Sequence, residues 1–311
     1  MVLKGDMRRV LSAILIFAAA QCAHGAATWW NRDYAARRAV TVYAPEVSLP
    51  GDNAAVVTFY TGGHLKKDGA DIRVVARGRE VPHMLFGVGP GDTATLAFAV
   101  EDGVRDYHIY FGNEKAESVD YKWEPQRGLI LETREYKGGN PRNIEAMREI
   151  WQESGPFYGA GSVDRIWHGQ NMYGPSEKFT SLYTGWFMAR VPGRYEFATS
   201  SDDASFLLVD GEVVVSWPGR HGPVADARHK GAVTLKAGVH KLQYAHASDG
   251  GSTCAVAAWL PPGGNAFEVI PEGVFTPLSR AVTGALEVAG ERVSADFTTE
   301  IAGEALLVTD D

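Results

Sequence analysis

The chain has 311 residues, of which 45% are hydrophobic and 22% are charged, and its formal net charge is −8. These proportions are typical of a soluble globular protein, and the length allows about two domains. The acidic balance argues against nucleic acid or an anionic membrane surface as the main partner.

The first 25 residues predict a signal peptide. Lys4, Arg8 and Arg9 precede the apolar stretch 10–20, which is too short to span a bilayer, and small residues follow up to a cleavage site at 23–25. Cys22 is not expected to carry a lipid anchor, because no leucine lies three residues before it. We therefore expect a secreted, periplasmic or cell-surface protein without membrane insertion.

Cleavage would change both the charge and the cysteine content. It removes a net charge of +2, so the remaining chain carries about −10. It also leaves Cys254 as the only cysteine, which excludes an intramolecular disulfide. Cys254 lies in a strand-like run and is expected to be a small buried hydrophobe rather than a nucleophile.

Residues 28–124 predict an N-terminal β-sandwich. Short runs rich in β-branched and aromatic residues alternate with glycine and proline turns, which is typical of an all-β domain. Strands are expected at 39–44, 55–61, 71–76, 95–100 and 106–112.

Residues 127–276 predict a second β-sandwich with one short helix. The helix is expected at 143–151, with Asn143 as its N-cap and Ile144, Met147 and Trp151 on one face. Strands follow, and Trp186 and Trp259 within them are expected in the core. Residues 277–311 predict a short β tail, either a strand pair added to the rest or the start of a longer protein. The predicted fold class is all-β, with two β-sandwich (jelly-roll-like) domains and one short helix.

Asp202 and Asp203 form the strongest candidate site. The two carboxylates follow a predicted strand, serines flank them, and Asp210-Gly211 predicts a hairpin turn just beyond. Hard oxygen ligands on a rim loop suit calcium. Alternatively, the carboxylates brace neighbouring backbone N–H groups in a tight loop, and the sequence leaves both interpretations open.

The loop 217–222 is a candidate recognition surface. Trp217, Arg220 and His221 combine a ring that stacks on a sugar with groups that hydrogen-bond its hydroxyls. The alternative is that Trp217 covers the edge of the sandwich. The histidines lack metal-ligand spacing, and nucleophile and phosphate-loop motifs are missing, so we expect no enzyme.

The second segment resembles the protective-antigen-type (PA-fourteen) sugar-binding β-sandwich. The matching stretches are 183–187, 192–197, 201–205, 208–211, 235–240 and 259–263. The resemblance implies that a cis peptide joins Asp202 and Asp203 and that both hold calcium, which binds sugar hydroxyls. A facing loop at 246–252 places His246 at the family's asparagine position and offers Ser248 and Asp249, the latter as a substitute metal ligand.

The first segment resembles a secreted bacterial domain of unknown function with concanavalin-like jelly-roll character. The matching residues are Trp30, Arg32, Tyr34, Arg37, Arg38 and the stretches 68–74, 81–83 and 107–113. This resemblance implies fold and export but no activity.

Together these observations predict a secreted, lectin-like protein that binds a polysaccharide or a cell-surface glycan, with calcium as a candidate cofactor. The alternative is a non-catalytic structural or interaction module of a surface assembly or of a larger carbohydrate-active enzyme system. The predicted ligand-binding residues are Asp202, Asp203, Trp217, Arg220, His221, Ser248 and Asp249, and the predicted metal ligands are Asp202, Asp203 and Asp249.

Overall fold

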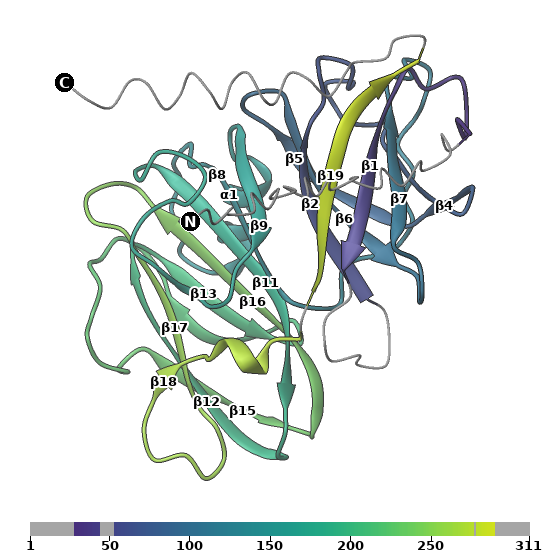
Figure 1. The fold of residues 1–311 in the computed structure, drawn as a ribbon. Helices are drawn as coiled ribbons and strands as arrows, with labels where there is room; N and C mark the ends of the chain where they lie inside the picture. The colour runs from purple at the N-terminus through teal and green to yellow at the C-terminus, as the bar shows by residue number, and fades with distance from the viewer. Residues whose placement is uncertain (1–27, 44–52, 277, 290–311) are drawn as a thin grey trace, which may run out of the picture. The chain divides into compact units, whose positions relative to one another are not determined.

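The computed structural model describes residues 28–43, 53–276 and 278–289, and this part of the chain is an all-β protein (Figure 1). The described residues form three β-sheets, one α-helix and one 3-10 turn, η1 (Glu272–Val274). None of their helices is long and apolar enough to cross a membrane. The predicted signal peptide and residues 290–311 of the predicted tail lie outside the described residues.

Eight strands form the N-terminal sheet. In sheet order they are β4 (Arg79–Val81), β3 (Arg73–Ala76), β7 (Asp106–Phe111), β1 (Ala36–Tyr43), β19 (Ser279–Val288), β2 (Asn53–Tyr60), β6 (Thr93–Val100) and β5 (His83–Gly89).

This sheet curls around a single hydrophobic core. Phe59 of β2 and Phe111 of β7 have ring centroids 5.6 Å apart, although two strands separate β2 from β7 in the sheet. Phe98 of β6 and Tyr107 of β7 approach to 5.0 Å in the same way. One apolar face therefore packs against itself, as in a sandwich.

Strand β19 completes this sheet, although it comes from the far end of the chain. It lies between β1 and β2 (Figure 1). It runs antiparallel to β1 through seven residue pairs and parallel to β2 through two. Residues 279–288 of the predicted tail thus form a central strand of the sheet, and this strand joins the strands that the first segment contributes on either side.

The remaining strands form a second β-sandwich. Its six-stranded sheet contains, in order, β14 (Glu212–Trp217), β13 (Ser205–Val209), β16 (Gly238–Ser248), β11 (Phe179–Ala189), β8 (Leu129–Glu135) and β9 (Phe157–Ser162). Its five-stranded sheet contains β10 (Trp167–His168), β17 (Cys254–Leu260), β12 (Gly193–Asp202) and β15 (Lys230–Leu235), and β18 (Glu268–Val269) also pairs with β17.

An aromatic core joins the two sheets of this sandwich. Phe187 of β11 makes edge contacts with Phe197 of β12 and with Trp259 of β17, at centroid distances of 6.0 and 6.1 Å. Each such side chain contributes about 1.5–3 kcal/mol when it is fully buried. Trp259 is a core residue as predicted, whereas Trp186 is only half-buried because its neighbours Gly185 and Phe187 are the residues that point inward.

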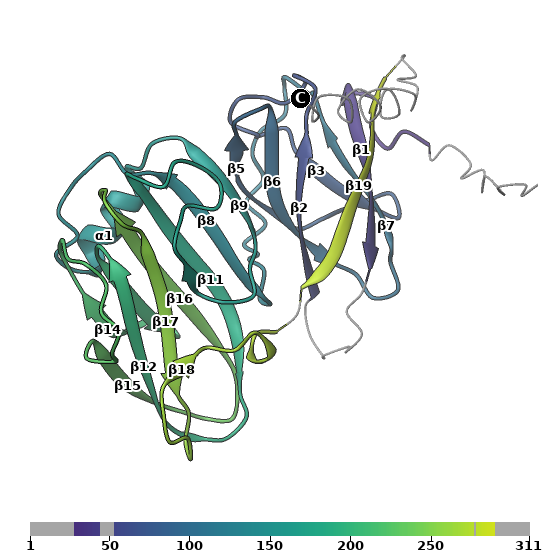
Figure 2. The same cartoon turned by 60° about the vertical axis from the view of Figure 1, so that its left-hand side comes forward.

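The helix α1 (Ile144–Gln152) packs on the outer face of the six-stranded sheet (Figure 2). The Asn143 Oδ1 accepts a hydrogen bond from the Ala146 N–H at 2.9 Å, so the predicted N-cap is confirmed. Met147 and Ile150 are the buried anchors. Trp151, predicted on the same face, is half-buried, and the Arg134 guanidinium lies 4.8 Å from its ring centroid.

Candidate functional site

The Asp202–Asp203 pair lies where the chain leaves one sheet of the second sandwich and enters the other. Strand β12 ends at Asp202 and strand β13 begins at Ser205. The Asp203 N–H donates to the Ala247 carbonyl at 3.0 Å, and the Ala247 N–H donates to the Ala204 carbonyl at the same distance. The peptide bond between the two aspartates is cis, as the resemblance implies.

Both carboxylates hold neighbouring loops in place. The Asp203 carboxylate accepts the His221 N–H at 3.1 Å and the Asp249 N–H at 2.9 Å. The Asp202 carboxylate accepts a hydrogen bond from the Ser252 hydroxyl. The pair is only 7% and 9% exposed, and it joins the loop after β14 to the loop after β16. This geometry is the bracing arrangement that the sequence left open.

His246 supports the pair from the interior of the sandwich. It lies in strand β16 and not in a loop, so the predicted facing loop begins only at Asp249. Its Nε2 donates to the Asp202 carbonyl at 2.9 Å, and its Nδ1 accepts from the Ser181 hydroxyl at 3.0 Å. Full burial lowers the pKa of His246 to about 4, so the ring is neutral at physiological pH.

Asp249 faces two cations. Its carboxylate forms ion pairs with Arg220 and with the Lys178 ammonium, the latter at 3.1 Å. Arg220 has a side chain that is 76% exposed, so it reaches Asp249 from the surface. Ser248, the neighbouring residue in β16, is fully buried, and its hydroxyl has no hydrogen-bond partner in the described part of the chain.

Trp217 is enclosed by two imidazoles. The His221 ring stacks on it at a centroid distance of 3.6 Å with an interplanar angle of 3°. The His229 ring stacks at 3.6 Å and 8°. Because both rings lie parallel to the indole at contact distance, they cover its faces. The predicted recognition loop therefore contacts the aspartates through the His221 backbone N–H and through the Arg220 side chain. Trp217 itself packs between the two histidine rings.

The oxygen atoms near Asp202 and Asp203 provide some, but not all, of the ligands that a hard cation such as calcium requires. Asp202 and Asp203 supply adjacent carboxylate oxygens. The unpartnered Ser248 hydroxyl is a neutral oxygen on the residue between Ala247 and Asp249, whose backbone groups both hydrogen-bond to Asp203. Among the described residues, however, no three His, Cys, Asp or Glu side chains gather as a metal-binding group. Asp249 would have to exchange its ion pairs before its side chain could serve as a third carboxylate ligand.

Some site residues were missed from the sequence. Ser252 contacts Asp202 and Lys178 contacts Asp249, but neither residue type in an isolated position signals a site. The serine and glycine content of 248–252 was the only available hint for Ser252.

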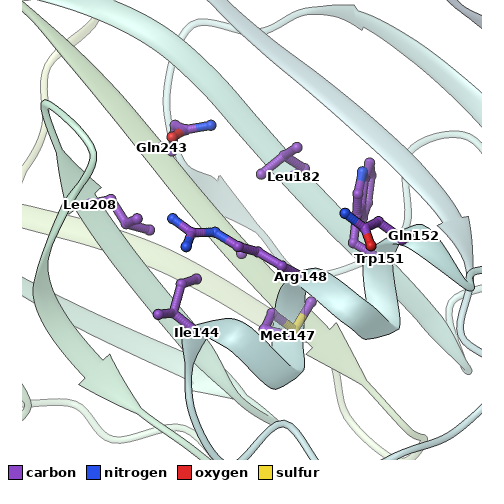
Figure 3. A pocket seen from close by; sticks show the side chains of 9 residues that line it. Ile144, Met147, Arg148, Trp151, Gln152, Leu182, Leu208 and Gln243 are labelled. Carbon is purple, nitrogen blue, oxygen red and sulfur yellow. The ribbon is translucent and has the colours of Figure 1, made fainter.

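Two of the cavities of the second sandwich lie on the outer faces of its sheets. One of about 130 Å³ lies between α1 and the six-stranded sheet, where Arg148 extends from the helix among apolar side chains that include Trp151 and Leu208 (Figure 3). The other, about 570 Å³, lies on the outer face of the five-stranded sheet and is lined by residues that include Trp167 and Ser200. We call this second cavity the sheet-face groove.

Comparison with known proteins finds a family model that matches part of the second sandwich. A family model described as the PA14 domain matches residues 158–273. No curated protein matches the chain. Similar solved structures include a PA14 sugar-binding domain from an RTX adhesin, with 18% identity, 49% of this chain and 98% of that chain covered, and a TM-score of 0.41.

Two further structures show a similar level of likeness. The PA14 domain of the MpAFP antifreeze protein has 14% identity, covers 53% of this chain and 96% of that chain, and has a TM-score of 0.43. The epithelial adhesin 9 A domain from Candida glabrata, solved in complex with Galb1-4GlcNAc, has 15% identity, covers 46% and 85%, and has a TM-score of 0.36.

Proposed function

We propose, from the premise that residues 158–273 form a PA14 domain, that this protein is an exported carbohydrate-binding protein without catalytic activity. The observation that carries the proposal is the position of the Asp202–Asp203 pair at the sheet crossover, where two loops meet at the Asp203 carboxylate. The expected ligand is a polysaccharide or a cell-surface glycan.

The chemistry of the site suits sugar hydroxyls. A carboxylate has about four acceptor positions, and the Asp203 carboxylate uses two of them for backbone N–H groups. The remaining positions on the pair accept hydroxyl donors. Arg220, whose side chain is largely exposed beside Asp249, offers donors to hydroxyl or carboxylate groups of a glycan.

Calcium is the second part of the proposal. When bound by Asp202 and Asp203, calcium would supply a hard Lewis acid for neighbouring sugar hydroxyls. Asp202, Asp203 and the Ser248 hydroxyl are the oxygen donors on this chain that favour it. Arg220 and Lys178 would then be released from Asp249 if that carboxylate joined the site.

A glycan array tests the proposal. The protein without residues 1–25 would be screened with calcium, with a chelator, and as the Asp203→Asn variant. Asp102→Asn, which changes an exposed carboxylate of the N-terminal sheet, is the matched control. Binding lost with the chelator and in Asp203→Asn, but kept in Asp102→Asn, is the expected result.

Other outcomes separate the parts of the proposal. Binding that survives the chelator but not Asp203→Asn would remove calcium and keep the sugar site. A calcium-dependent rise in melting temperature, absent in Asp203→Asn, measures the metal site independently of any glycan. No binding by a folded protein to any glycan would contradict the proposed function.

A further inference from the structure

We propose that the sheet-face groove is a second carbohydrate subsite, built around Trp167, which binds sugar units adjoining the one held at Asp202 and Asp203. This inference rests on the proposed function and extends it from a single sugar to an oligosaccharide. It names a surface that the sequence did not indicate.

Strand register places Trp167 and Asp202 on the same face of the five-stranded sheet. Trp167 pairs with Val256, and Val256 pairs with Ser200, so these three residues form one row across β10, β17 and β12. Residues paired directly across strands point to the same face. Asp202 lies two positions after Ser200 on β12, so it belongs to that face as well.

The adjoining row identifies that face as the outer one. His168 pairs with Ala255, and its Nδ1 is 2.7 Å from the Tyr183 hydroxyl in the interior of the sandwich. Because successive residues of a strand alternate between faces, Trp167 points outward. Spacings of about 4.8 Å between strands and 3.3 Å along them place the Cα atoms of Trp167 and Asp202 about 12 Å apart, a span suited to a short oligosaccharide.

The groove has an open floor of small side chains. Its volume is about 570 Å³, which lies within the usual range of roughly 300–1,000 Å³ for ligand sites. Ala198, Ser200, Val256 and Ala258 lie on the floor, whereas Phe197 and Trp259 of the same strands point into the core. Ser200, Val256 and Ala258 are partly exposed, and their small side chains leave room for a flat ligand such as a sugar ring.

Trp167 supplies the stacking surface. The residue is 58% exposed, and its side chain has no ring contact or hydrogen bond with the rest of the described chain. This contrasts with Trp217, whose faces are covered by histidines. An exposed indole offers an apolar face for the C–H side of a sugar and an N–H donor for a hydroxyl.

The loop 218–229 forms one wall of the groove, and the same loop contacts the aspartate site. The Ser200 hydroxyl donates to the Val224 carbonyl at 2.7 Å and is 3.1 Å from the Val224 N–H, which anchors the loop 218–229. The same loop donates the His221 N–H to Asp203. Glu268 also lines the groove, but its carboxylate accepts the Trp259 indole N–H at 3.2 Å and, through its pairing with Trp259, belongs to the inner face of the sheet.

Isothermal titration with oligosaccharides of increasing length tests this subsite. The probes are gluco- and galacto-oligosaccharides of one to six units. The proteins are the wild type, Trp167→Ala, Trp167→Phe, Asp203→Asn and Tyr60→Ala. Tyr60 is a matched control because it is an aromatic residue of the N-terminal sheet with 53% exposure. Melting temperatures would confirm that all variants are folded.

The expected result is a gain in affinity with length that depends on Trp167. In the wild type and in Tyr60→Ala, affinity rises about tenfold from one unit to the longest probe, which corresponds to about 1.4 kcal/mol. Trp167→Ala keeps the affinity for one unit and loses that gain, while Trp167→Phe keeps part of it.

The opposing results separate the two proposals. A gain with length that persists in Trp167→Ala would overturn the subsite and leave the aspartate site intact. Binding that survives Asp203→Asn but is lost in Trp167→Ala would overturn the proposed aspartate site and keep the groove. A wild type that binds no probe of any length would overturn both.

Discussion

Protonation of His246 is expected to destabilise the protein in mild acid. The neutral ring donates to the Asp202 carbonyl and accepts from the Ser181 hydroxyl inside the sandwich. A protonated ring could not accept from Ser181, and its charge would be fully buried. Acidification toward pH 4 therefore weakens the hydrogen bonds beneath the aspartate pair.

The magnitude follows from the change in pKa between the two states. The pKa of His246 is about 4 in the folded protein because of burial, and about 6.5 in the unfolded chain. Since the folded pKa is the lower one, the contribution is fully present above pH 6.5 and is lost as the pH falls toward 4. At pH 4.5 the expected loss in the free energy of unfolding is about 2.5 kcal/mol.

Urea unfolding at pH 7.0 and pH 4.5, compared between the wild type and His246→Gln, measures this loss. Glutamine keeps a donor and cannot take up a proton, so the variant should lose about 2.5 kcal/mol less than the wild type between the two pH values. His83 in the N-terminal sheet has a pKa that burial also lowers to about 4, so His83→Gln should reduce the loss in the same direction and provides a second test of the argument. If His246→Gln and the wild type lose the same free energy, the argument is refuted.

Three further predictions concern the second sandwich. Burial raises the pKa of Glu132 to about 7, so Glu132→Gln should raise the free energy of unfolding by about 3 kcal/mol at pH 8 and leave it unchanged at pH 4. Equal effects at both pH values in urea titrations would contradict this. In Gly231→Ala the added methyl group would lie 1.8 Å from the Val214 carbonyl oxygen, so β14 and β15 must separate at a cost of about 3 kcal/mol or more. A wild-type melting temperature for that variant would count against the contact. Asn143→Ala should cost about 1 kcal/mol through loss of the helix cap, while Asn143→Ser should restore most of it; unfolding curves that do not separate these two variants would argue against capping.

The predictions that were wrong concern residues whose positions depend on pairing between strands that are distant in the sequence. Trp186 was expected in the core because it lies in an apolar run, yet strand alternation turns Phe187 inward and leaves Trp186 half-buried. The family resemblance placed His246 in a facing loop, whereas its pairing with Ser181 and Ser205 places it in β16, which extends through Ser248. The two-residue strand β10 has no periodicity by which a sequence could reveal it.

The sequence by itself determined the all-β class, the helix with its Asn143 cap and the hairpin at Asp210, and it indicated the Asp202–Asp203 pair as the candidate site. These features depend on turn residues, strand composition and short motifs, which are local properties of the chain. Only the tertiary structure decided that β19 closes the first sheet, that histidines cover Trp217, and that Trp167 shares a face with Asp202. Those outcomes depend on which distant strands pair and in what register, because a shift of one residue would turn each side chain to the opposite face.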